Sequence, residues 1–328
     1  SVPFLWLRSK DDELRRLVQR DFNHPSVIIW SICNEILCKR GANATRSLAD
    51  GHRMHALFHA LDPGSDRVVS ANYNDWIIPD TPLDLIGVDY HTQRYDDVHR
   101  GSPTVPIISS ETSSAVSDRG EYSNNRSSGH VSGYDVNAPS WGQTAEAAWG
   151  GVGEPAGQGI LTRPFVSGGW TWTGFDYKGE PTPYAWPDIN SHFGILDMVG
   201  FAKDRAYWYE THFKQFAPGE GSVHLFPHWN WMPHANGSAT AGRMDSATAH
   251  TQAHLAPCRG PCHPSVFGGA DVDVWAYTNA ASVELFVNGV SHGKVRVANF
   301  SHAQWLAVPY VPGELRAVAS DAAEEVGA

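Results

Sequence analysis

The sequence lacks the features that mark several common classes of protein. No apolar run approaches the roughly 18–20 residues of a membrane-spanning helix, and no charged segment followed by an apolar core opens the chain, so no signal peptide is visible. Lys and Arg number 24 against 35 Asp and Glu, which gives a formal net charge of −11. A chain with this charge and no basic run has no electrostatic means of holding nucleic acid or an anionic membrane.

Cysteine is scarce, and its four residues fall into two pairs. Cys33 and Cys38 flank Glu35, and Cys258 and Cys262 share one loop, where they either close a small disulfide or remain thiols. A zinc site in that loop would have only one cysteine pair. We therefore expect no metal ion and no other cofactor.

Glycosylation sequons give a weak indication of compartment. Four Asn-x-Ser/Thr sequons occur, at Asn43, Asn125, Asn236 and Asn299. Chance supplies some of them, so they only weakly favour a secreted, periplasmic or lumenal location.

Aromatic residues, in contrast, are abundant. The chain has 13 Trp and 11 Tyr, several of them beside Gly, Pro and Asp rather than in apolar runs. Aromatic faces beside carboxylates suit a sugar, because the C–H face of a pyranose packs on the ring while its hydroxyls form hydrogen bonds. Taken singly, each ring is more often part of a core.

The first two thirds of the chain alternate between helical and strand patterns. Helices are expected at residues 9–20, 46–61 and 203–213, and short buried strands at 27–30, 67–70, 85–90, 106–110 and 165–172. Such alternation indicates parallel βα units, and polar residues follow the strand ends, where a (β/α)8 barrel builds its active site. Only five strands are visible, so we expect an α/β fold over residues 1–217: the C-terminal part of a TIM barrel, about strands 4–8.

The pattern changes after about residue 217. Short alternating strands are expected at residues 222–226, 271–278, 283–287, 294–297 and 315–319, with Asn288-Gly289 as a hairpin turn signal. They predict an immunoglobulin-like β-sandwich over residues 218–328, incomplete at its end. Residues 234–267 are rich in Ala, His and Gly without periodicity, so we expect a long surface insertion there.

A barrel of five strands would leave two strand edges unpaired and part of its core exposed. We therefore expect this stretch to fold poorly without further βα units before Ser1. Oligomer formation stays open.

Two glutamates occupy matching positions at the ends of predicted strands. Asn34-Glu35 follows one apolar strand, and Glu111 follows another. Carboxylates at neighbouring strand ends can face each other across a glycosidic bond, with about 5–5.5 Å between them in retaining enzymes and about 6.5–9.5 Å in inverting ones. The alternative is a pair of surface glutamates on loops.

Several segments resemble glycoside hydrolase family 2, in the order that the family has them. Residues 20–35 (RDFNHPSVIIWSICNE) resemble its acid/base signature, and residues 107–112 (IISSET) resemble the nucleophile segment of its β-galactosidase branch. Similarity to the last barrel strand and the following sandwich domain extends over residues 168–197, KDRAYWYETHF, LFPHWNW and VELFVNG. It covers nearly the whole chain apart from 234–267.

The resemblance implies a hydrolase that cleaves terminal β-galactosides by double displacement, with Glu35 as acid/base and Glu111 as nucleophile. It implies further that Asn34 binds the sugar 2-hydroxyl and that Tyr90 contacts the nucleophile and modulates its basicity. Two alternatives stay open: a β-glucuronidase or other β-glycosidase of the family, and a truncated, non-catalytic carbohydrate-binding relative.

Three more residues are candidates for substrate binding. The resemblance places Trp172 under the sugar as its platform. Asp176 either binds a sugar hydroxyl or caps its turn, and His91 at the rim either reaches substrate or has no role in binding it. Alternatively, the side chains of Trp172 and Tyr90 belong to the hydrophobic core and do not bind the sugar.

His52, His55 and His59 share one face of the helix expected at residues 46–61. A metal site on this face would need another ligand, and the outward-facing helix of a barrel is the wrong place for one. We therefore expect a solvated face.

Overall fold

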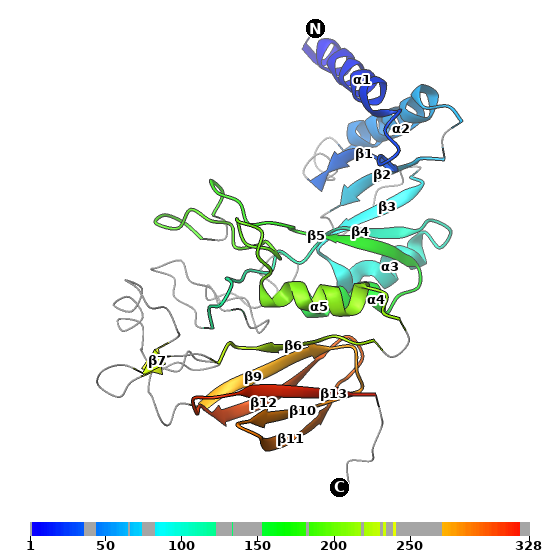
Figure 1. Ribbon diagram of the computed structural model, residues 1–328. Helices are drawn as coiled ribbons and strands as arrows, with labels where there is room; N and C mark the ends of the chain where they lie inside the picture. Colours follow the sequence, from blue (N-terminus) through cyan, green and yellow to red (C-terminus); the bar gives the residue numbers. More distant parts are fainter. Residues whose placement is uncertain are drawn as a thin grey trace. The chain divides into compact units, whose positions relative to one another are not determined.

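Figure 1 shows a computed structural model of the chain, which describes residues 2–35, 44–64, 66–73, 83–122, 133, 153–181, 184–217, 220–229, 232–233, 239–240 and 271–321. The chain divides into two compact units: Ser1–Thr112 with Gly159–Thr171, and Ser113–Gln158 with Trp172–Ala328. The domain boundary at residue 217 stays a prediction. Most of the expected insertion at 234–267 lies outside the described residues. No described helix is long and apolar enough to cross a membrane.

The first unit is built on a five-stranded parallel sheet in the order β1-β2-β3-β4-β5. The strands are β1 (Ile29–Asn34), β2 (Val68–Tyr73), β3 (Leu85–Asp89), β4 (Ile107–Thr112) and β5 (Val166–Thr171). The helices are α1 (Val2–Asp21), α2 (Ala44–Leu61), the short 3-10 helix η2 (Thr92–Arg94) and α3 (Tyr95–Gly101), while α4 (Gly153–Leu161) spans the division between the units. Strands that are neighbours in sequence are also neighbours in the sheet and run parallel, as in a (β/α)8 barrel. The expected partial TIM barrel is confirmed.

Burial on both faces explains why these short segments are strands. Every residue of β3 is buried, and β2 and β4 are largely buried as well. Trp30 of β1 stacks on Phe58 of α2 with ring centroids 5.5 Å apart. A strand covered on both faces has no polar side to alternate with, which is why these segments read as short continuous apolar runs.

Arg67 holds the turn that leads from α1 into β1. Its guanidinium donates hydrogen bonds to the carbonyl oxygens of Phe22 at 2.7 Å, His24 at 3.3 Å and Val27 at 2.6 Å. A carboxylate oxygen of Asp62 accepts a fourth bond at 2.9 Å. These bonds tie the segment between α1 and β1 to the residue that precedes β2.

The second unit contains two antiparallel three-stranded sheets. One has the order β12-β9-β6, from His302–Pro309, Asp271–Thr278 and Val223–Phe226; the other has the order β11-β10-β13, from Val290–Arg296, Ser282–Val287 and Leu315–Ser320. Their inner side chains form one core, which includes Val274, Leu285 and Trp305. Two sheets that share a core are a β-sandwich, as expected.

Three further elements belong to this unit. Helix α5 (Asp204–Phe213) contacts β6 and β9, and β7 (Met232–Pro233) pairs with β8 (Ala239–Thr240). The predicted hairpin turn is confirmed, because Asn288 and Gly289 have φ angles of 50° and 81° and connect β10 to β11.

Several predicted boundaries need correction, and helices η2, α3 and α4 and strands β7, β8 and β12 were not predicted. Strand β4 covers Ile107–Thr112 rather than 106–110, so Glu111 lies within the strand rather than after it. Helix α1 begins at Val2 rather than at Ser9, and β1 covers Ile29–Asn34 rather than 27–30. Strand β12 was not predicted, because its register shifts between Trp305 and Val308 and breaks the alternation that marks a strand.

Candidate active site

Three carboxylates meet where strands of the first unit end. Glu35 directly follows β1, Asp89 is the last residue of β3, and Glu111 lies near the end of β4. One carboxylate oxygen from each lies within 4.8 Å of the others. Asp89 is fully buried, while Glu35 and Glu111 are partly exposed. The carboxyl ends of parallel strands share one edge of the sheet, so the sheet itself brings these groups together.

The backbone is unusual at two of these strand ends. Glu35 has φ 40° and Tyr90 has φ 63°, values in the left-handed region that residues with a Cβ seldom adopt. The N–H of Tyr90 donates to the carbonyl oxygen of Glu111 at 2.6 Å, which helps to hold this conformation. Such conformations cost of order 1–3 kcal/mol and cluster at functional sites, where surrounding contacts maintain them.

Glu111 receives hydrogen bonds from two residues predicted for the site. The hydroxyl of Tyr90 donates to its Oε2, and Asn34 forms a second side-chain hydrogen bond with it. Burial raises the pKa of Glu111 above its ordinary value, and the charge of Glu35 acts in the same direction. The hydrogen bonds from Tyr90 and Asn34 act against this rise, because they stabilise the carboxylate form.

Asp89 also belongs to this group of carboxylates, although it was not predicted as a site residue. Burial raises the pKa of its carboxyl to about 7; the charges of Glu111 and Glu35 add to the rise, and the hydrogen bond from Ser110 opposes it. The hydroxyl of Ser110 donates to Oδ1 at 2.5 Å, whereas the buried Oδ2 has no hydrogen-bond partner among the described residues. A pKa near neutral makes Asp89 a group that holds or releases a proton close to both glutamates.

Asn34 and His91 have further partners at the same edge. Nδ2 of Asn72, in β2, donates to Oδ1 of Asn34 at 3.3 Å. The ring of His91 contacts the side chain of Gln93, with Nδ1 3.4 Å from Nε2. The structure thus brings Asn34 and Tyr90 to Glu111, places His91 beside Tyr90, and adds Asn72 to the predicted residues.

The other two predicted residues belong to the second unit. Trp172 packs with Val116, Tyr184 and Phe193, and the peptide bond that follows it is cis. The buried carboxylate of Asp176 accepts hydrogen bonds from Nζ of Lys203 at 2.8 Å and from the N–H of Gly194 at 2.8 Å. These bonds tie together the segment after β5. The roles of Trp172 and Asp176 in sugar binding stay predictions.

Cys33, two residues before Glu35, is disulfide-bonded. The three other cysteines all lie outside the described residues.

Two family models match the chain. Residues 4–125 match the TIM barrel domain of glycosyl hydrolases family 2, and residues 269–327 match a domain of unknown function, DUF4982. The first match contains Glu35, Asp89, Tyr90 and Glu111, and the second contains most of the β-sandwich strands.

Known proteins resemble nearly the whole chain. The β-galactosidase BoGH2A of Bacteroides ovatus is 30% identical over 96% of this chain and 37% of its own length, and a putative β-glucuronidase of Formosa agariphila is 27% identical over 93% of this chain and 27% of its own. The crystal structure of a β-glycosidase from Bacteroides vulgatus is 25% identical with a TM-score of 0.62, over 92% of this chain and 36% of that one.

The chain thus spans roughly a third of the length of these relatives. Within that part, the barrel model matches the unit that carries the three carboxylates, and the similarity to the relatives runs on into the sandwich. Residues 4–125 thus match the barrel domain of glycoside hydrolase family 2, and nearly the whole chain resembles a β-galactosidase at 30% identity.

Proposed function

We propose that this chain carries the catalytic centre of a retaining β-glycosidase that acts on terminal β-galactosides. The observation that carries the proposal is the group formed by Glu35, directly after β1, and Glu111, near the end of β4, with carboxylate oxygens within 4.8 Å. This spacing supports retention, because an inverting enzyme needs about 6.5–9.5 Å between its carboxylates to admit a water molecule.

The surroundings of Glu111 suit the role of nucleophile. The hydrogen bonds from Tyr90 and Asn34 favour the ionised form of Glu111, which suits a nucleophile. In the first step, Glu35 gives its proton to the glycosidic oxygen as Glu111 attacks the anomeric carbon and the leaving alcohol departs. In the second step, Glu35 takes a proton from water, and the water oxygen displaces Glu111 from the sugar.

The charges around the site favour a neutral sugar over a uronate. The charged groups that act on the pKa of Glu111 and of Asp89 are the carboxylates of Glu35 and Glu111, and no cation among the described residues is a cause of either shift. A glucuronide would bring another carboxylate into this acidic group at an electrostatic cost. The relative with 30% identity is named a β-galactosidase, which also supports a galactoside, although another relative is named a putative β-glucuronidase.

A panel of aryl glycosides tests the substrate. We expect turnover of p-nitrophenyl β-galactoside to exceed that of the glucuronide and the N-acetylglucosaminide, with the β-anomer of galactose as the first product seen by NMR. Preference for the glucuronide would refute the galactosidase proposal, and the α-anomer would refute retention. No turnover of any glycoside by a protein that circular dichroism shows to be folded would favour the non-catalytic alternative.

Azide rescue tests the role of Glu35. The Glu35→Ala variant should lose general acid and base catalysis, and azide should restore turnover of an activated substrate and yield β-galactosyl azide, because azide needs no general base. The matched control is Glu210→Ala. Glu210 is an exposed residue of α5, and its side chain forms an ion pair with Lys214. Absence of rescue, with wild-type activity in the control, would remove Glu35 from this role.

A further inference from the structure

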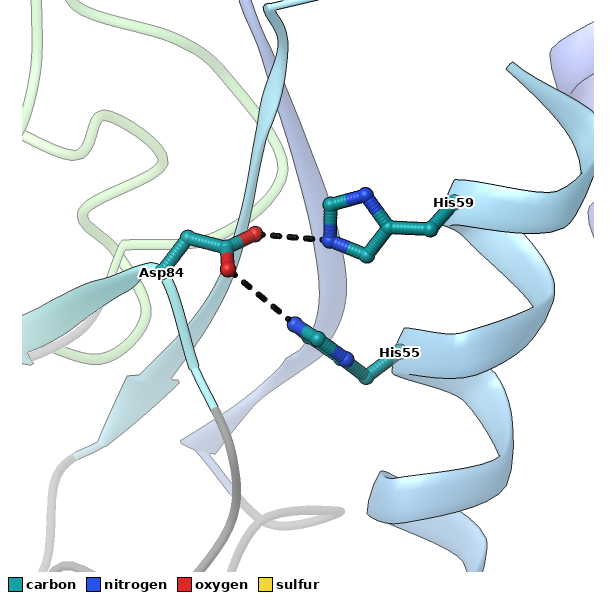
Figure 2. A group of neighbouring side chains, drawn as sticks. All are labelled: His55, His59 and Asp84. Atoms are coloured by element: carbon teal, nitrogen blue, oxygen red, sulfur yellow. Dashed lines mark hydrogen bonds and ion pairs between the residues drawn. The ribbon is translucent and has the colours of Figure 1, made fainter. Parts of the chain in front are cut away.

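Two histidines of α2 converge on one carboxylate outside the candidate active site (Figure 2). Nε2 of His55 lies 3.3 Å from Oδ1 of Asp84, and Nε2 of His59 lies 2.9 Å from Oδ2. Asp84 directly precedes β3, so the three side chains connect the helix to the sheet. The predicted solvated face of α2 therefore has a carboxylate partner.

The carboxylate is held in place by the chain around it. The N–H of Val69 donates to Oδ2 of Asp84 at 2.8 Å, and the N–H of Asp84 donates to the carbonyl oxygen of Val69 at 3.1 Å. Hydrogen bonds of this kind orient a ligand before an ion arrives, which lowers the cost of binding. Asp84 is thus fixed, and both imidazoles already point at it.

The spacing of the three donor atoms suits a small divalent ion. The two histidines are four residues apart on one helix, a spacing that places two imidazoles side by side for metal ligation. The ligand atoms all lie within 4.8 Å of one another, and the ligands of a tetrahedral zinc ion lie about 3.4 Å apart. Small rotations of the exposed His59 side chain are enough to admit an ion between them.

The exposure of the side chains allows an ion to enter from solvent. The side chains of His55, His59 and Asp84 are 17%, 46% and 33% exposed. Imidazole nitrogens together with one carboxylate favour zinc or a similar transition metal over magnesium and calcium, which prefer sets of oxygen ligands.

We propose that His55, His59 and Asp84 bind a divalent transition metal ion of the zinc type, with water completing its coordination. The site lies at the beginning of β3, whereas Asp89 and the glutamates lie at the other end. Five residues of strand, at roughly 3.3 Å each, separate the two by about 16 Å. The ion therefore joins α2 to β3 and stabilises the fold without taking part in the reaction.

Zinc titration of the metal-free protein tests this site. After treatment with a chelator and its removal, we expect calorimetry to show saturable binding of zinc chloride and the melting temperature to rise with zinc but not with magnesium. His59→Gln and Asp84→Asn should each weaken zinc binding at least about tenfold and abolish the rise. The matched control, His52→Gln, changes a histidine of the same helix outside the group and should bind zinc as the wild type does.

Two readouts separate lost binding from lost folding. Each variant should keep the circular dichroism spectrum of the wild type, and cobalt should give the wild-type protein, but not the His59→Gln variant, the visible absorption of a tetrahedral complex. Absence of saturable zinc binding in the wild type would overturn the proposal. Equal zinc affinity in the wild type and a folded His59→Gln variant would overturn it as well.

Discussion

The hydroxyl of Tyr90 donates a hydrogen bond to Oε2 of Glu111, and the N–H of the same tyrosine bonds to the carbonyl oxygen of that glutamate. One residue after β3 thus fixes both the side chain and the main chain of a residue in β4. Because the hydroxyl bond stabilises the carboxylate form, Tyr90 controls the orientation and the basicity of Glu111 together.

Replacing Tyr90 by Phe removes only the donor. A hydrogen bond to a charged group contributes about 1.5–3 kcal/mol, so we expect kcat/KM to fall roughly 10- to 100-fold. The pKa of Glu111 should rise, since the bond had lowered it, and the acidic limb of the pH profile should move to higher pH. The control is Tyr207→Phe, a tyrosine that stacks on His224 in the second unit. An unchanged acidic limb in the Tyr90→Phe variant would contradict this role.

Asp89→Asn should change how stability depends on pH. Burial raises the pKa of Asp89 to about 7 from an ordinary value of 3.8. Between these values the folded state holds a proton that the unfolded state has released, so this carboxyl lowers the unfolding free energy as pH rises from about 4 to 7. Asparagine does not titrate, so the variant does not lose unfolding free energy in this way. In the wild type the loss amounts to at most about 4 kcal/mol.

Urea unfolding of wild type and Asp89→Asn at pH 5 and pH 8 measures the effect. The stability of the variant relative to wild type should increase between the two pH values. If the difference in unfolding free energy between the two proteins is the same at both pH values, Asp89 titrates as it does in the unfolded chain.

His192 lies buried between two carboxylates of the second unit, with Nδ1 2.7 Å from Asp118 and Nε2 2.7 Å from Asp188. Burial opposes its charge, but the hydrogen bonds and charges of both aspartates outweigh burial and raise the pKa of His192. A raised pKa gives stability that is fully present below about pH 6.5 and is lost as pH rises through the folded value.

The His192→Gln variant should therefore lose stability relative to wild type mainly at low pH. Thermal melts at pH 5.5 and pH 8.5 should show a larger difference in melting temperature at pH 5.5. His292→Gln, at an exposed position of β11, is the control. A difference that does not change with pH would mean that His192 titrates as it does in the unfolded chain, which would contradict a raised pKa.

The barrel strands could be predicted because each is a short apolar run with polar residues after it. Helix α4 could not, because its sequence, GEPAGQGIL, has low intrinsic helix propensity. Tertiary contacts hold it instead: a Cβ on Gly157 would lie 2.1 Å from Trp208, and Gln158 donates to the carbonyl oxygen of Phe300 at 3.0 Å. No pattern in the sequence reveals such contacts.

The same distinction applies to the sites. Glu35 and Glu111 were predicted because each stands at or near the end of an apolar strand, a property of the local sequence. The near-neutral pKa of Asp89 depends on burial between strands, and the partner of His59 lies 25 residues further along the chain. Both depend on the packing of distant segments, which the local sequence does not specify.

Trapping of the glycosyl-enzyme intermediate tests the central claim most directly. A 2-deoxy-2-fluoro-β-galactosyl fluoride forms the intermediate faster than it is hydrolysed, so the sugar should remain attached to the nucleophile. The account predicts that mass spectrometry of the digested protein finds one added fluorogalactosyl group, on Glu111, and none in the Glu111→Gln variant. A label on Glu35 or on any other residue would contradict it.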